Sequence, residues 1–479
     1  MYSDIISFID WDFFKSPSSI AKVSDIASFP EGEKEIVLQR DDEYNLTGKL
    51  YFQDKTFFQK IHDERNKENV AGKVYDGFDV IGSYSNNALI SLKSCRLGGL
   101  SYPGGKDFLG SADLNFNELN IKFTEKAPTR LREWYLNGPS QRASIESAEQ
   151  KILRQCSKER FLSNEKLDLA ENFGPCCLSK HYLWGKNSDY KFLLAKVPIE
   201  ESKWSTNIQI EYHKDWGKIP EPDERLKIEE LCSFVFGKHL LSLGYTAYDS
   251  DENIVEVYAH SPWGQDAKTF CSQPEYPPIR IHDYPPGDAE KIVNFLLPKY
   301  AELNEMLCLQ EALWNYWISF DIPVGTNLPI IASALETIID NWYKSKNTKS
   351  RGFYLDPEKF EEIIKDNVLD LKGKLEGIEN GQKIIDNVRR ANAFGIMERY
   401  RKFFEEIELR ISPVEWEAIM GRHAFVHGHV HFDTTDWKQV IRQVNTLHTL
   451  FNRTLLKILG YKWDYIDRSV EGWPDAKLG

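Results

Sequence analysis

The segment Pro277-Pro-Ile-Arg-Ile-His-Asp-Tyr-Pro-Pro-Gly287 divides the sequence into two parts with different hydrophobic periods. Its prolines and glycine favour turns and interrupt both helices and strands. Before it, apolar residues come in short, often alternating runs, which are typical of strands; after it, they recur at the three- and four-residue spacing of helices. We therefore predict an α+β protein, with a β-rich domain over residues 1–285 and an all-α antiparallel helical bundle over residues 286–479.

The front part is expected to be antiparallel β structure, because its runs are rich in β-branched and aromatic residues and are separated by turn-forming clusters. The predicted strands are Glu35–Gln39, Gly48–Phe52, Ala88–Lys93, Leu119–Phe123, Lys191–Val197, Asn207–Tyr212 and Asn253–Tyr258. Two helices are expected between them, at Ser144–Leu162 and Pro222–Leu243.

The rear part shows helical spacing with start and stop signals, such as Pro413 at a start and Gly460 at an end. The predicted helices are Asp288–Phe320 (one helix or two in tandem), Asn327–Lys346, Asp356–Leu375, Gly381–Leu409, Pro413–Gly428 and Asp436–Leu459. The connections between them are short, which favours antiparallel neighbours.

The charge balance limits the kinds of partner. The chain has 60 Lys and Arg against 73 Asp and Glu, a net charge of −13. This excludes a protein that coats nucleic acid through bulk positive charge, so an RNA contact would need a local basic patch. One predicted helix offers such a patch: Arg389, Arg390, Arg399, Arg401 and Lys402. These side chains either form a solvated face balanced by nearby acids or bind RNA phosphates.

The ends and the cysteines indicate a compartment. The first residues carry acids and no basic region of the kind that opens a secretory signal, and no apolar run reaches the length of a membrane helix. The seven cysteines are scattered. We expect a reduced, cytoplasmic protein without a membrane partner.

The most unusual segment is Gly421-Arg-His-Ala-Phe-Val-His-Gly-His-Val-His431, which holds four of the 11 histidines. In one interpretation they are surface or core histidines. In a second, His423 and His427 bind a metal from one helical face, with His429 and His431 as further ligands. However, Ala424 stands where the glutamate of an HExxH motif would be.

In a third interpretation, Arg422 and His427 cleave RNA without a metal. Histidine can act as base or acid near neutral pH, and arginine binds phosphate oxygens with two parallel hydrogen bonds. RHAFVHG resembles the signature of the HEPN superfamily, an Arg, a polar residue, three variable residues and a His. On an ideal helix Arg422 and His427 lie about 140° apart. The family resolves this by dimerisation, which brings two copies of the motif into one cleft.

The surroundings resemble the ApeA-like branch of that superfamily. The matching segments are Ala312–Trp317, Asn327–Glu336, Leu131–Leu136 and Leu231–Leu240. The resemblance implies a bacterial, metal-independent endoribonuclease without a cofactor, which cuts RNA such as tRNA in abortive anti-phage defence. It also implies a front domain that senses a phage-derived trigger, and a homodimer formed through the C-terminal helical domain.

The resemblance also implies roles for individual residues. Arg422 would bind the scissile phosphate, His427 would be the base or acid, and His423 would orient or assist. Glu336, an acid within an apolar helix, would face the active cleft or be paired internally. Two alternatives stay open: a non-catalytic HEPN-type binding or scaffold module, and a histidine-ligated metal hydrolase.

Overall fold

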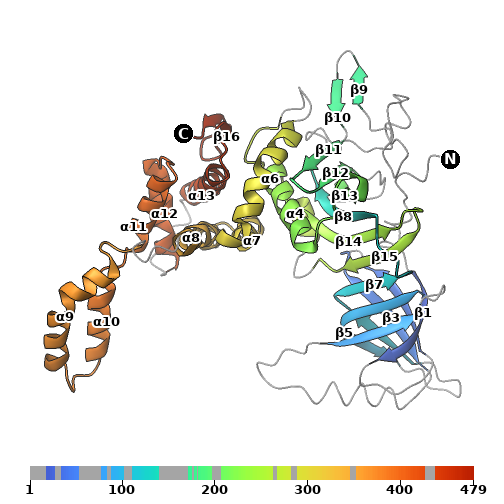
Figure 1. Cartoon of the computed structure of the whole chain (residues 1–479), viewed down its shortest axis with the longest axis horizontal. Helices are drawn as coiled ribbons and strands as arrows, with labels where there is room; N and C mark the ends of the chain where they lie inside the picture. The colour runs from blue at the N-terminus through green and yellow to red at the C-terminus, as the bar shows by residue number, and fades with distance from the viewer. Residues whose placement is uncertain are drawn as a thin grey trace. The chain divides into compact units, whose positions relative to one another are not determined.

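The protein folds into two compact units (Figure 1). The computed structural model describes residues 18–26, 34–41, 43–52, 77–83, 88–101, 110–139, 171–174, 177–180, 182–196, 206–262, 267–281, 288–345, 352–426 and 437–479. The first unit comprises residues 1–277 and 281–295, and the second comprises residues 278–280 and 296–479. An antiparallel sheet forms the first unit and helices dominate the second, so the predicted α+β class is confirmed.

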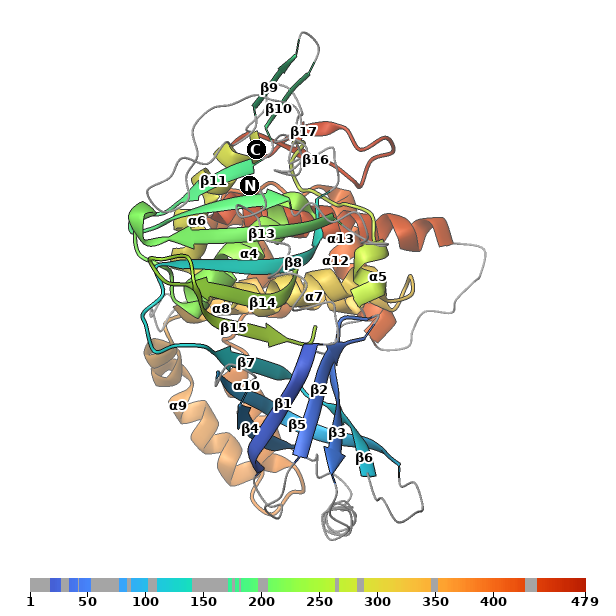
Figure 2. The ribbon, with the colours of Figure 1, turned by 90° about the vertical axis from the view of Figure 1, so that its right-hand side faces the viewer.

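Six strands of the first unit close into a ring (Figure 2). They are β1 (Ser18–Ile26), β2 (Lys34–Arg40), β3 (Leu46–Phe52), β4 (Phe78–Ser83), β5 (Leu89–Ser101) and β6 (Gly110–Asn115). The order is β5-β4-β1-β2-β3-β6, and β6 pairs back onto the end of β5. Alternate residues such as Ile36, Leu38 and Leu50 are buried, as expected for a barrel interior.

The start of β5 also pairs with β7, and so continues the barrel into an open antiparallel sheet. That sheet runs in the order β7 (Glu118–Lys122), β15 (Ile254–His260), β14 (Leu241–Tyr248), β8 (Arg130–Gly138), β13 (Thr206–His213), β12 (Lys191–Lys196) and β11 (Tyr182–Lys186). β9 (Glu171–Gly174) and β10 (Cys177–Lys180) form a separate hairpin, and α5 (Ala267–Ser272) is a short helix after β15. All seven predicted strands are present, in β2, β3, β5, β7, β12, β13 and β15.

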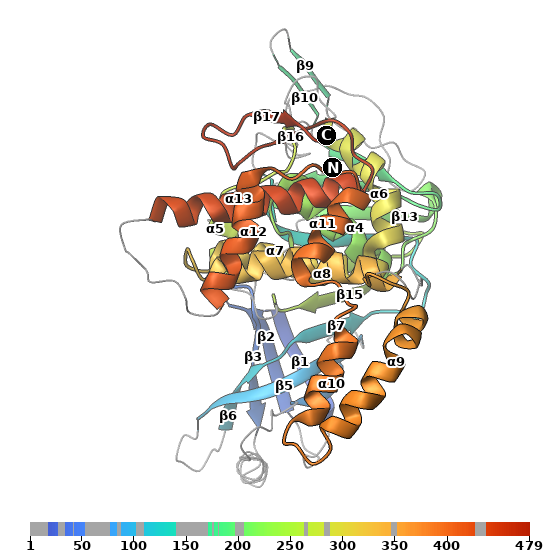
Figure 3. The same cartoon turned by 90° about the vertical axis from the view of Figure 1, so that its left-hand side faces the viewer.

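Helix α4 (Pro222–Phe236) lies against one face of the open sheet, as Figure 3 shows. The predicted helix to Leu243 was wrong at its end, because Gly237 adopts a left-handed conformation with φ of 67° and Leu241 begins β14. A Cβ at Gly237 would lie 2.0 Å from the backbone nitrogen of Pro277, so only glycine fits. The predicted helix at residues 144–162 lies outside the described residues.

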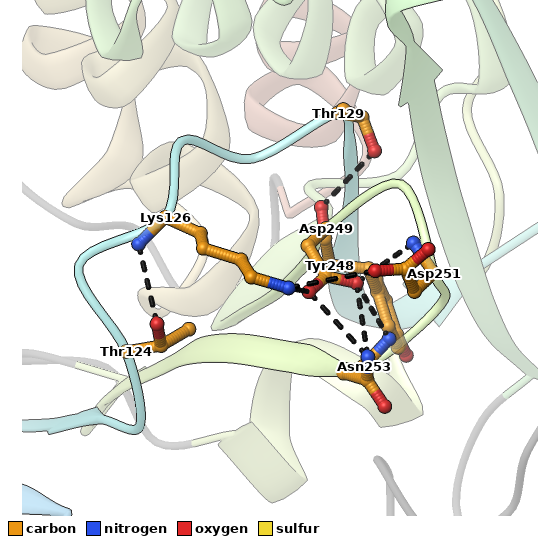
Figure 4. Close-up of polar contacts among 7 residues, drawn as sticks. All are labelled: Thr124, Lys126, Thr129, Tyr248, Asp249, Asp251 and Asn253. Atoms are coloured by element: carbon orange, nitrogen blue, oxygen red, sulfur yellow. Dashed lines mark hydrogen bonds and ion pairs between the residues drawn. The ribbon is translucent and has the colours of Figure 1, made fainter.

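The turn between β14 and β15 is held by a carboxylate that accepts several hydrogen bonds (Figure 4). Asp249 Oδ1 accepts from the backbone N–H groups of Asp251 and Asn253 at 2.9 and 3.0 Å. Its Oδ2 accepts from the Lys126 ammonium at 2.7 Å. The Lys126 hydrogen bond is the main reason that the pKa of Asp249 falls to about 2, so this turn keeps its carboxylate charged at neutral pH.

The second unit is helical. Its elements are α6 (Asp288–Leu307, which begins in the first unit), α7 (Leu309–Asp321), α8 (Asn327–Ser345), α9 (Pro357–Lys374), α10 (Gly381–Arg390), α11 (Ile396–Glu406), α12 (Pro413–Val426), α13 (Trp437–Ile458), β16 (Asp464–Ile466) and β17 (Asp475–Lys477). The helix is interrupted between α6 and α7 at Cys308, which adopts a left-handed conformation with φ of 50°. Helices α8, α12 and α13 contact one another, and α7 packs against α8 (Figure 3).

The prediction of one helix over Gly381–Leu409 was wrong, because α10 and α11 are separate. The side chain of Asn392 accepts from Leu355 N and donates to Leu355 O, both at 2.8 Å. A β-bridge joins Phe353 to Ala393. The residues between α10 and α11 therefore bond to the segment before α9 and do not continue the helix.

Within the part of the chain that the structure describes, no helix is both long and apolar enough to cross a membrane.

Candidate functional site

Helix α12 carries the start of the histidine-rich segment. Arg422 and His423 lie in its last turns, where the negative end of the helix dipole stabilises a positive charge. Position 422 follows Glu415 by seven residues and therefore lies on the same face of α12 as that buried residue. The side chains of Arg422 and His423 are not among the described ones, and His427 lies beyond the described residues. The predicted pairing of Arg422 with His427 stays a prediction.

The start of α12 is fixed by a capping box and a buried ion pair. Ser412 N donates to Glu415 Oε2 at 2.7 Å, and Glu415 N donates to Ser412 Oγ at 3.3 Å. The Arg453 guanidinium on α13 donates to Glu415 Oε1 and, at 2.9 Å, to the carbonyl of Arg410. These contacts tie α12 to α13 at the end opposite Arg422.

Near its other end, α12 approaches α13 closely at Gly421. A Cβ at this position would lie 3.0 Å from the side-chain nitrogen of Gln443 on α13. One turn earlier, Gln439 Nε2 donates to Glu417 Oε1 at 3.4 Å. The two helices therefore stay in contact up to the residue before Arg422.

Glu336 is half-buried on α8, a helix that contacts α12. One turn further along α8, Asp340 pairs with Arg399 of α11 at 2.5 Å. The structure thus places Glu336 on a helix that borders α12, and its role in an active cleft stays a prediction.

The predicted RNA-binding cations do not share one helix. Arg389 and Arg390 lie on α10, and Arg399, Arg401 and Lys402 on α11. Four of them pair with carboxylates: Arg389–Glu361 at 3.3 Å, Arg399–Asp340 at 2.5 Å, Arg401–Glu398 at 2.6 Å and Lys402–Glu405 at 3.1 Å. Arg390 is exposed. These pairs match the interpretation of solvated helix faces, while RNA binding by these cations stays a prediction.

A serine–histidine pair in the second unit is structural. Ser319 Oγ lies 2.7 Å from His448 Nε2, and it donates its proton to the Tyr316 carbonyl at 2.6 Å. The imidazole stacks on Phe320 with ring centroids 4.1 Å apart, and burial lowers its pKa to about 3. Since the hydroxyl proton is directed to a backbone carbonyl and both side chains are buried, this pair is not an activated nucleophile.

Among the described residues, no group of three or more His, Cys, Asp or Glu side chains is placed to bind a metal ion. The metal interpretation of the histidine-rich segment depends on residues beyond this description.

The sequence did not predict a set of buried charges that lies on β8 in the first unit. Every residue of β8 is buried. Toward α4, Glu133 accepts from Arg225 Nε at 2.7 Å, from the Tyr135 hydroxyl at 2.8 Å and from the Tyr212 hydroxyl at 3.2 Å. Burial raises the pKa of Tyr135 and of Tyr212 well above the ordinary value, so both remain donors.

The opposite face of β8 carries Arg130, Arg132 and Trp134. Arg132 Nε donates to Glu211 Oε2 of β13 at 3.0 Å, and Arg130 pairs with Glu252 in the turn after β14. The guanidinium of Arg130 also covers the ring of Tyr248, 3.9 Å from its centroid. In Leu131–Leu136, two charged residues directly precede two aromatic residues, and this order does not distinguish a buried strand from an exposed one.

Comparisons with family models, with curated proteins and with solved structures returned no match for this chain.

Proposed function

We propose that the protein is a metal-independent endoribonuclease of the HEPN type, similar to the ApeA-like branch, that acts in anti-phage defence. The observation that supports it is the segment Arg422–Gly428. Its first residues occupy the last turns of α12, a helix anchored to α13 and in contact with α8. In this proposal the C-terminal unit is an HEPN-like bundle.

The chemistry follows from the residue types. His427 takes the proton of the 2′-hydroxyl or donates one to the leaving 5′-oxygen, and Arg422 stabilises the charge on the phosphorane. His423 orients the substrate, and Glu336 contributes from α8. The products carry 2′,3′-cyclic phosphate ends, and no metal takes part.

Two copies are needed to complete the cleft, and three exposed apolar side chains next to the histidine-rich segment, which we call the apolar patch, are available for their contact. Met420, Trp437 and Ile441 are 61%, 45% and 45% exposed. They flank residues 421–436 on both sides, on helices that contact each other. A second copy that docks on this patch would bring two histidine-rich segments together. Because a C2 interface uses the same surface twice, one patch is sufficient.

The test is cleavage of total RNA and of purified tRNA by the full-length protein in EDTA, followed by mapping of the new ends. We expect Arg422→Ala and His427→Ala to abolish cleavage with an unchanged melting temperature. Arg96→Ala, which removes an exposed arginine of β5, is the matched control. Cleavage by the double variant would refute the proposal, and loss of wild-type cleavage in EDTA would favour the metal hydrolase. Intact RNA under every inducing condition would favour the non-catalytic module.

A further inference from the structure

The last strand of the open sheet is covered by side chains of helix α6 (Figure 1). Among the described strands, β11 has a neighbour, β12, on one side only. On its other side, Trp184 N donates to Glu290 Oε2 at 3.1 Å. The Asn294 carboxamide accepts from Lys186 N at 2.7 Å and donates to the Trp184 carbonyl at 2.8 Å. We call these three hydrogen bonds the α6 clamp.

The α6 clamp takes the place of a further strand at the edge of the sheet. Trp184 and Lys186 are two residues apart, so their backbone groups point to the same side of β11. A carboxamide offers a donor and an acceptor, as a peptide group does, and Asn294 uses both. Unpaired backbone groups at a sheet edge are open to pairing with another chain. Whatever binds this side of β11 therefore has to displace the clamp.

Helix α6 belongs to both compact units. Residues 281–295 are in the first unit, which also contains β11, and from Leu296 the helix is in the second unit. One buried stripe with the spacing of a helix face crosses this boundary: Ala289, Val293, Leu296, Leu297, Tyr300, Leu303 and Leu307. The clamp therefore holds the start of a helix whose remaining turns are part of the second unit.

The hydrogen-bond ladder of α6 is interrupted where the two units meet. Pro298 lies inside the helix, and proline has no N–H to donate to the carbonyl four residues earlier. That carbonyl belongs to Asn294, the residue whose side chain holds β11. Prolines inside helices are common sites of bending. The clamp, the missing helical hydrogen bond and the boundary between the units thus coincide within a few residues.

We propose that α6 is a latched hinge between the two units. The α6 clamp holds the first turns of the helix on β11, and the helix opens over residues 294–298 when the clamp is released. An event at the edge of the sheet is passed in this way to a helix of the second unit. The device is independent of the proposed cleavage site, and its test needs no RNA.

The test is limited digestion of the full-length protein with chymotrypsin, with hydrogen exchange measured in parallel. Chymotrypsin cuts after aromatic residues, and Phe295 follows Asn294 directly, so cleavage after Phe295 reports opening of the helix. Asn294→Ala removes two of the three clamp bonds without lowering helix propensity. Asn315→Ala is the matched control, because Asn315 is half-buried on the next helix, α7. Pro298→Ala restores the missing N–H.

We expect Asn294→Ala to accelerate cleavage after Phe295 and exchange of the β11 amides about tenfold, and Asn315→Ala to change neither. Glu290→Ala should act in the same direction, whereas Glu290→Gln, which keeps an acceptor for Trp184 N, should not. Pro298→Ala should slow cleavage after Phe295. In Asn294→Ala/Pro298→Ala, the β11 amides should still exchange fast while cleavage returns toward the wild-type rate.

The proposal is overturned if Asn294→Ala accelerates exchange of β11 but not cleavage after Phe295, because the clamp would then only cover a sheet edge. It is also overturned if Pro298→Ala leaves cleavage unchanged in both backgrounds. Equal acceleration at sites throughout the chain would indicate global unfolding and would overturn it as well.

Discussion

The buried ion pair between Glu415 and Arg453 should decide whether α12 keeps its place. Both side chains are less than 10% exposed, and the guanidinium also satisfies the Arg410 carbonyl. Arg453→Met would leave a buried carboxylate without its counter-charge. Removing one partner of such a pair costs about 3–5 kcal/mol of folding free energy. For a unit of this size, each kcal/mol lowers the melting temperature by about 2–4 °C, so we expect a decrease of roughly 6–20 °C.

The double variant Arg453→Met/Glu415→Gln separates the charge effect from the loss of packing. Glutamine at position 415 can still accept from Ser412 N and so preserves the capping box, but it leaves no buried charge. The double variant should therefore regain more than half of the lost stability. Thermal melts followed by circular dichroism measure the change, and hydrogen exchange of α12 and α13 peptides assigns it to the second unit.

Arg442→Met is the matched control, because Arg442 is exposed on the same helix. A single Arg453→Met variant that melts with this control would refute the reasoning. So would a double variant no more stable than Arg453→Met, because the cost would then come from lost packing and not from the uncompensated carboxylate.

Three further perturbations test separate parts of the structure. Arg40 donates to the carbonyls of Leu243 and His260 at 2.7 and 3.0 Å, so Arg40→Met should destabilise the first unit by about 2–3 kcal/mol in denaturant melts. Burial lowers the pKa of His448 to about 3, so between pH 6.5 and pH 3 this histidine is protonated in the unfolded chain but not in the folded one. The free energy of unfolding should therefore decrease as the pH is lowered through this window, and His448→Gln should make that decrease smaller. Trp437→Asp/Ile441→Asp should sediment as a monomer and should not cleave RNA, and a stable dimer would contradict the proposed interface.

The sequence was most informative where local pattern and burial agree. Strands such as β2 and β13 could be predicted because alternation and β-branched residues point to the same conformation. β8 could not be predicted, because both of its faces are buried and its charged residues have partners on β13, on α4 and in the turn after β14. Such pairing is a property of the folded sheet and leaves no local signal.

The helix break between α10 and α11 depends in the same way on a distant contact, since the Asn392 side chain bonds a residue 37 positions earlier. In the candidate site, the capping box at Ser412 and Glu415 was readable as an S-x-x-E pattern. The role of Arg453 was not readable, because its partner lies 38 positions away on another helix.

The charge pairs in the second unit refine the argument from net charge. Four of the five predicted RNA-binding cations already neutralise a carboxylate, so they add little positive potential in one protomer. In the proposed enzyme, binding of RNA phosphate would therefore depend on other cations, and one motif arginine per protomer would be a weak anchor. In the proposed dimer, two motif arginines would share one cleft, while each chain keeps its net charge of −13. An enzyme built this way would bind RNA only as a dimer, which makes the apolar patch on α12 and α13 the control point of the proposed activity.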